Sequence, residues 1–446
     1  MRMYTSLLLG AIVFLPATGL GESPFQAGVG IHLGRPNDSV TAALAAIQST
    51  ELTFRGDAYW STIETSKGVL SWPSALDDLD VLVDAMVAKK LRPILVLGYG
   101  NQFHDGGTQP FSNDGISAYV RYALYVVEHF RNRVNQFEVW NEWSFGAGAR
   151  GAGNKGDAIQ YRNLLRATYT AIKTVRSDVV VLGGGSGVGG KQSAWVTAFI
   201  AAGGLDTLDG FSVHPYVHCD GGVKGSLPLT GSPLFEPKRS SVPAVPSARA
   251  AVNEAIGGTP EEAISRIDTL HHQFDKSKPG KSVPIYITEM GWPTSSAQCG
   301  IPQFAAAAYL QRFFLQARAR PWIAGVWWYD LFDDGNDDSN REHRFGLFSS
   351  AGRAKPAATR LQAILRFMNS SSVSINVGSK GEYVVDGRDS DGKKWYAAWI
   401  PTNDFDAEME WPLGSQLLST GYRDQSGSLT SSGVYLSAAP VILEHP

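Results

Sequence analysis

The octapeptide QFEVWNEW, residues 136–143, begins as a strand and ends on a polar pair. Its apolar residues suit a packed sheet, yet Asn141 and Glu142 follow them with no turn residue between. The decapeptide VPIYITEMGW repeats this arrangement, because Glu289 comes directly after an apolar run that ends at Thr288. Two apolar strands that each lead into a carboxylate indicate a sheet with functional groups along one edge.

Short apolar runs of β type alternate with amphipathic helical patterns along most of the chain. Near-continuous apolar strands separated by helices imply an α/β fold whose parallel sheet is covered on both faces. Eight such units over about 340 residues predict a (β/α)8 TIM barrel with long insertions. An open, doubly wound sheet stays the alternative, because periodicity does not show closure. The runs are residues 28–31, 52–55, 92–99, 137–140, 179–184, 210–213, 284–288 and 323–329.

Both ends of the chain depart from this pattern. Residues 1–21 have the charged start, the apolar stretch SLLLGAIVFLPA and the small residues of a secretory signal peptide. The catalytic barrel is therefore expected over residues 22–368 of a periplasmic or secreted protein. Residues 369–446 change to short alternating runs such as SVSINV and KKWYAAWI. They predict a small antiparallel, β-sandwich-like domain packed on the barrel, as a structural appendage rather than a carbohydrate-binding module.

Composition and cysteine count narrow the class of protein. Hydrophobic residues make up 43% and charged residues 18%, which is typical of a globular protein. A net charge of −3 gives no reason to expect nucleic acid or an anionic membrane as partner, and no segment after the signal peptide is long enough to span a membrane. Cys219 and Cys299 follow neighbouring predicted strands, so we expect a disulfide that ties a long loop to the barrel rim.

The barrel explains the carboxylates at the strand ends. The active site of such a barrel lies at the carboxyl ends of its strands, and Glu142 and Glu289 belong to the tips of strands four and seven. Hydrolysis of a glycosidic bond needs one carboxylic acid that protonates the departing oxygen and one carboxylate that acts at the anomeric carbon. Arg55 at the end of strand two could keep Glu289 ionised, and either His214 or Tyr216, after strand six, could donate a hydrogen bond to this nucleophile.

Two aromatic side chains complete the predicted site. Trp328, at the end of strand eight, could form an apolar floor under a sugar ring, and His32, at the tip of strand one, is expected to line the cleft rather than bind a metal. No metal ion or cofactor is expected.

The sequence resembles the clan A glycoside hydrolases, and within them family 39 and the Psl-type hydrolases of biofilm exopolysaccharide. The motifs that carry the resemblance stand in the family's order between residues 28 and 366: FRGDAYWSTIETSKGVLSW, FEVWNEW, SVHPY, IYITEMGWPT and GVWWYDLFDDG. This resemblance implies a retaining, two-glutamate enzyme with Glu142 as general acid/base, Glu289 as nucleophile and Asn141 as partner of the sugar 2-hydroxyl. It also implies that Arg55 and Tyr216 hold the nucleophile, and that His214 and Trp328 line the subsite of the cleaved sugar.

The expected substrate is a polysaccharide or oligosaccharide, and the expected protein is a monomer that cleaves an exopolysaccharide internally. Removal of terminal sugars by a xylosidase-like β-glycosidase and non-catalytic polysaccharide binding are the alternatives. The long segment 217–258, rich in Gly, Pro and Ser, is expected to shape the subsites.

Two motifs suggest other functions but fit them poorly. The stretch GSGVGGKQ, residues 185–192, resembles a phosphate-binding loop, but Gln192 stands where a Ser or Thr should hold magnesium. We expect these glycines to let the backbone turn closely at the barrel mouth. The acidic loop DLFDDGNDDSN, residues 330–340, lacks the regular ligand spacing of a calcium site and is expected to be solvated.

Overall fold

A computed structural model describes the barrel and most of the C-terminal strands. The predicted signal peptide, residues 1–21, lies outside the described residues, as does most of segment 217–258. Among the described residues, no helix combines the length and the apolar character needed to cross a membrane. The description covers residues 25–34, 39–48, 50–150, 156–219, 258–378, 381–401 and 434–444, with short strands at 238–239, 407–411, 422–423 and 429–430.

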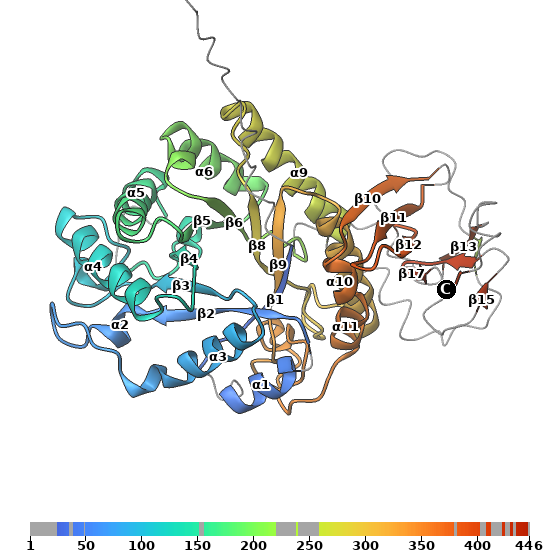
Figure 1. Ribbon diagram of the computed structural model, residues 1–446, viewed down its shortest axis with the longest axis horizontal. Coiled ribbons are helices and arrows are strands. Elements are labelled where there is room, and N and C mark those ends of the chain that lie inside the picture. The colour runs from blue at the N-terminus through green and yellow to red at the C-terminus, as the bar shows by residue number, and fades with distance from the viewer. Residues whose placement is uncertain are drawn as a thin grey trace, which may run out of the picture.

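Eight parallel strands close into a barrel, as predicted (Figure 1). The last strand of the barrel, β9, pairs with the first, β1, from Gln26 opposite Gly325 to Val29 opposite Trp328. This pairing excludes the open doubly wound sheet. In order around the barrel the strands are β1 (Gln26–Gly30), β2 (Thr53–Tyr59), β3 (Ile94–Gly98), β4 (Gln136–Val139), β5 (Val180–Ser186), β6 (Gly210–Val213), β8 (Ile285–Met290) and β9 (Ile323–Trp328).

Helices surround the barrel and bury their apolar faces against it (Figure 1). Their starts follow ordinary capping chemistry: the Thr259 side chain accepts a hydrogen bond from the backbone of Glu262, and Pro260 occupies the first turn of α9. The helices are α1 (Val40–Gln48), α2 (Trp60–Ile63), α3 (Asp77–Ala88), α4 (Asn113–His129), α5 (Ala158–Val175), α6 (Gly190–Ala201), α9 (Pro260–Ser277), α10 (Gln303–Arg318) and α11 (Pro356–Met368).

Three strands continue beyond the ends that their apolar runs predicted, and one of them is β5, which continues to Ser186. β2 continues to Tyr59, which pairs with Gly98 of β3, so Arg55 lies within the strand and not at its end. Residues 55–57 (Arg, Gly and Asp) hid this continuation, because the run of large apolar side chains stops before them. β8 likewise continues through Glu289. The long Arg55 side chain still reaches the barrel mouth from its lower position.

The chain after α11 forms antiparallel strands, which lie beside α10 and α11 in Figure 1. Trp395 and Trp399 are buried in the same apolar cluster as the barrel helices, and the Trp399 indole donates a hydrogen bond to Glu261 of α9 at 3.1 Å. The division at residue 368 stays a prediction, although the antiparallel sheet itself is confirmed. Its strands run in the order β10 (Ser372–Val377), β11 (Tyr383–Arg388), β12 (Lys394–Trp399), β17 (Val441–Glu444), β14 (Tyr422–Arg423) and β15 (Leu429–Thr430).

A second, three-stranded sheet joins this C-terminal region to the long loop after β6. It has the order β16 (Val434–Leu436), β13 (Ala407–Trp411) and β7 (Lys238–Arg239), all antiparallel.

Candidate active site

A cleft of about 850 Å³ opens at the carboxyl ends of the barrel strands. This is the face on which barrels of this kind build their sites. Every site residue expected from the sequence lines the cleft except Trp328, and these residues are His32, Arg55, Asn141, Glu142, His214, Tyr216 and Glu289.

Glu142 and Glu289 are close together in the cleft. One oxygen of each carboxylate and one ring nitrogen of His214 all lie within 4.8 Å of one another. The Glu142 side chain is 30% exposed, whereas that of Glu289 is 9% exposed. The two carboxyl groups therefore share a site but not an environment, which is the condition for opposite protonation states.

Glu289 is held by two donors. Arg55 Nη1 donates to Oε1 at 2.8 Å, and the Tyr216 hydroxyl donates to Oε2 at 3.2 Å. Burial opposes the charge on Arg55, but the carboxylates of Glu138 and Glu289 outweigh it and raise the Arg55 pKa, so the guanidinium stays cationic. Burial and the Glu289 charge raise the Tyr216 pKa well above its usual value, so the phenol keeps its proton and remains a donor.

Asn141 lies between Arg55 and the β3 tip. Its Oδ1 accepts from Arg55 Nη2 at 2.8 Å, and its Nδ2 donates to the Tyr99 hydroxyl at 2.7 Å. These two contacts fix the orientation of the amide beside Glu142.

The backbone at Glu142 is unusual and depends on glycine. Glu142 has φ 50° and ψ 41°, in the left-handed region that non-glycine residues adopt rarely and mainly where the surroundings hold them. Gly185 of β5 packs against it, and a Cβ there would lie 3.0 Å from the Glu142 nitrogen. The glycine-rich stretch at 185–192 thus permits the close approach of β5 that supports the acidic residue.

His214 contacts both carboxylates, and a third carboxylate lies beneath it. The His214 ring places Nδ1 3.0 Å from Glu142 Oε1 and 3.6 Å from Glu289 Oε2. Its Nε2 lies 3.0 Å from Thr288 Oγ1, which donates to Glu138 Oε1 at 3.1 Å. Sequence reasoning missed Glu138 and Thr288. The available signal was an acidic residue in the middle of an apolar strand, since Glu138 is fully buried in β4.

The floor of the cleft differs from the prediction at Trp328. That side chain is only 1% exposed, and its indole donates to the Phe345 carbonyl at 3.3 Å. Tyr329, the next residue, lines the cleft instead. Successive side chains of a strand point to opposite faces, and the sequence does not reveal which of two adjacent aromatic residues faces the cleft.

His32 lines the cleft as expected, together with Asp57 and Tyr59 of β2, which were not foreseen. His32 Nδ1 lies 3.3 Å from Asp57 Oδ2, and the Tyr59 hydroxyl donates to the same oxygen at 3.1 Å. Burial opposes the charge of Asp57, but its contacts with His32, Arg55 and Tyr59 outweigh it and lower the Asp57 pKa, so this carboxylate is ionised.

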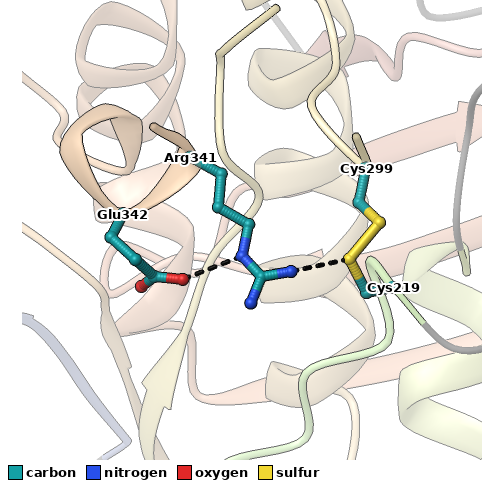
Figure 2. The surroundings of a disulfide bond; sticks show 4 residues. All are labelled: Cys219, Cys299, Arg341 and Glu342. Carbon is teal, nitrogen blue, oxygen red and sulfur yellow. Dashed lines mark hydrogen bonds and ion pairs between the residues drawn. A yellow bond between two sulfur atoms is a disulfide. The ribbon is translucent and has the colours of Figure 1, made fainter. Parts of the chain in front are cut away.

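A disulfide between Cys219 and Cys299 forms part of the rim, with the two Cα atoms 5.3 Å apart. Figure 2 shows Arg341 extending between Glu342 and this disulfide: Nη1 donates to Cys219 Sγ at 2.9 Å, and Nε donates to Glu342 Oε1 at 2.8 Å. The bridge ties the chain after β6 to the loop after β8.

We expect the protein, purified without reductant, to carry this disulfide in solution. Mass spectrometry of the unreduced protein after alkylation should detect a peptide pair joined through Cys219 and Cys299 and no alkylated thiol. Two alkylated cysteines would contradict the bridge. Prior reduction supplies the control, since it should release both thiols and add two alkyl groups.

No protein-family model and no curated protein matches this chain. Among solved structures, a family 39 glycoside hydrolase from the gut symbiont Bacteroides cellulosilyticus WH2 is 23% identical with a TM-score of 0.69, covering 95% of this chain and 81% of its own.

Two further solved structures are similar in fold over the same share of this chain. A monomeric beta-xylosidase from Caulobacter crescentus CB15 is 17% identical with a TM-score of 0.59, covering 95% of this chain and 97% of its own. An enzyme of glycoside hydrolase family 39 from Xanthomonas axonopodis pv. citri is 18% identical with a TM-score of 0.59, covering 95% of both chains. At these identities the likeness shows that this chain has the fold of family 39 glycoside hydrolases.

Proposed function

We propose that this protein is a retaining glycoside hydrolase of the family 39 type, with Glu142 as general acid/base and Glu289 as nucleophile. The observation that carries the proposal is the carboxyl pair at the barrel mouth, whose nearest oxygens lie within 4.8 Å. Retaining glycosidases place the two groups about 5–5.5 Å apart, whereas inverting enzymes leave about 6.5–9.5 Å for a water molecule. The short separation supports a direct attack by one carboxylate.

The contacts around the pair support this assignment of roles. Glu289 accepts from Arg55 and Tyr216, which orient an ionised carboxylate for attack on the anomeric carbon. Glu142 is the more exposed of the two, so it can reach the glycosidic oxygen and give it a proton as the bond breaks. The covalent glycosyl-enzyme is then hydrolysed by a water from which Glu142 removes a proton.

The substrate is proposed to be an exopolysaccharide that is cut internally, as the Psl-type resemblance of the sequence implies. A cleft of about 850 Å³ is near the upper end of small-molecule pockets and offers room for more than one sugar ring. Phe145 lines the cleft beside Glu142 and is 55% exposed, which provides an apolar face for a sugar on the leaving-group side. The enzyme is proposed to be exported and to act as a monomer without a cofactor.

A second candidate is removal of terminal sugars by a β-xylosidase-like enzyme. Its support is the shared fold with the beta-xylosidase from Caulobacter crescentus. The lengths of the products formed early from a panel of bacterial exopolysaccharides and xylo-oligosaccharides separate the two: internal cleavage gives long oligosaccharides first, and terminal removal gives monosaccharides.

The stereochemistry of the product tests the mechanism. We expect the first-formed sugar to keep the anomeric configuration of the substrate, because two displacements at the same carbon restore it. Proton NMR during the first turnovers, before mutarotation, measures this. A first product of inverted configuration would contradict the role of Glu289 as nucleophile. Failure to release sugar from any polymer that the protein binds would favour the non-catalytic alternative.

A further inference from the structure

Six side chains, all buried except Glu142, form a continuous chain of hydrogen bonds that links the two members of the carboxyl pair. Starting from Glu289, the chain runs through Arg55 to Glu138, then to Thr288 and His214, and ends at Glu142. Glu138, Thr288 and His214 are each at most 1% exposed. The members come from β2, β4, β8 and the segment after β6, so the barrel closure brings them together.

The direction of each hydrogen bond follows from which groups can donate. Arg55 Nε donates to Glu138 Oε2 at 2.6 Å in an ion pair, so Glu138 is a carboxylate and only accepts. Thr288 has a single hydroxyl hydrogen, which it gives to Glu138 Oε1. Towards His214 the same hydroxyl can therefore only accept, and the hydrogen of this contact must belong to His214 Nε2.

We infer that Glu138, acting through Thr288, keeps a hydrogen on Nε2 of His214 in both charge states of the ring. Nδ1 is then the atom at which His214 gains or loses its proton, and this atom faces Glu142 and Glu289. Glu138 and Thr288 are positioning residues for the proposed reaction, because they act through His214 and touch neither carboxylate of the pair.

This arrangement suits a residue that must serve as acid and then as base. A neutral His214 with a bare Nδ1 accepts the hydrogen bond of a protonated Glu142. Once Nδ1 is protonated, it donates to the Glu142 carboxylate. His214 thus accepts the acid hydrogen of protonated Glu142 and donates to the ionised form, whereas a ring with its hydrogen fixed on Nδ1 could only donate.

The charges around His214 support protonation at Nδ1. Burial opposes the charged ring, but the carboxylates of Glu289 and Glu142 outweigh burial and the repulsion from Arg55, and raise the His214 pKa above its usual value. The neutral ring is therefore observed at a pH above that raised value, and the tautomer is best measured there.

The substitution Glu138→Gln is expected to reverse the direction of the hydrogen bonds from residue 138 to His214, and it provides the sharpest test. The Gln carbonyl must face Arg55 Nε, so its amide group faces Thr288 and donates to it. Thr288 then turns its hydrogen towards His214 Nε2, and the ring hydrogen must move to Nδ1. Thr288→Ser is the matched control, because serine keeps a hydroxyl at the same place and should leave the hydrogen on Nε2.

Long-range proton–nitrogen NMR of protein with labelled histidine rings measures the tautomer directly. The chain has 9 histidines, and the signal that His214→Asn removes identifies the ring. We expect Nε2–H in the unchanged protein and in Thr288→Ser, and Nδ1–H in Glu138→Gln. A ring that carries its hydrogen on Nδ1 in the unchanged protein overturns the inference, whether or not Glu138→Gln folds.

Kinetics give a second readout that a merely structural role would not move. This kinetic test rests on the proposed function, whereas the NMR measurement of the tautomer does not. In Glu138→Gln, protonated Glu142 loses its acceptor, so kcat/KM should fall by about tenfold more for substrates with poor leaving groups than for activated aryl glycosides. An equal fall for both classes would contradict the link to Glu142. The expected tautomers in a protein that releases no sugar would support the hydrogen-bond chain and refute the proposed function.

Discussion

Glu289→Ala is expected to abolish turnover on every substrate, with kcat falling by on the order of 10⁴-fold or more, because no covalent intermediate can form without the nucleophile. The loss should be equally severe for polymers and for activated aryl glycosides, since both need attack at the anomeric carbon. Steady-state rates on the two substrate classes measure it. Glu289→Gln should behave the same way while keeping the shape of the side chain.

The control for this variant is Glu128→Ala. Glu128 lies on α4, 59% exposed, and pairs with Arg131 at the surface. Its removal should leave rates unchanged, because a surface ion pair contributes little to stability. Equal thermal unfolding of the two variants would show that loss of activity is not loss of fold. Appreciable activity of Glu289→Ala on an aryl glycoside would contradict the assignment of the nucleophile.

Glu142→Ala is expected to be selective. Polymers, whose leaving groups need a proton, should lose about 10²- to 10⁴-fold in kcat, the usual contribution of general acid catalysis. An activated aryl glycoside needs little protonation, so the glycosyl-enzyme should still form and then be hydrolysed slowly, because no base activates the water. A rapid burst of released phenol followed by a slow steady state is the expected time course.

Azide identifies the missing group in this variant. It attacks the glycosyl-enzyme without needing a base, so added azide should speed the steady state and yield a glycosyl azide of retained configuration. Product analysis by NMR measures both effects. If azide instead rescued Glu289→Ala with retention and left Glu142→Ala unchanged, the two roles would be exchanged.

The parallel barrel follows from patterns that are local in the sequence. Apolar runs separated by amphipathic helices predict parallel strands covered on both faces, and carboxyl ends of parallel strands meet on one side. For this reason the sequence alone places Glu142 and Glu289 at a common mouth, although 147 residues separate them (289 − 142). The same reasoning indicates that Cys219 and Cys299 lie on the same face.

The sequence could not determine which side chains of different strands contact one another. The stagger of the barrel strands decides which inward-facing side chains lie in the same layer. A change of one position turns a side chain to the opposite face. Thus Trp328 was expected in the cleft, where Tyr329 lies, and Arg55 was expected at a strand end but lies lower in β2. Glu138 is an isolated polar residue in an apolar run and Thr288 ends another run, and only closure of the sheet brings them to His214 and Arg55. The sequence by itself determined which groups do the proposed chemistry, and the tertiary structure decided which groups hold them.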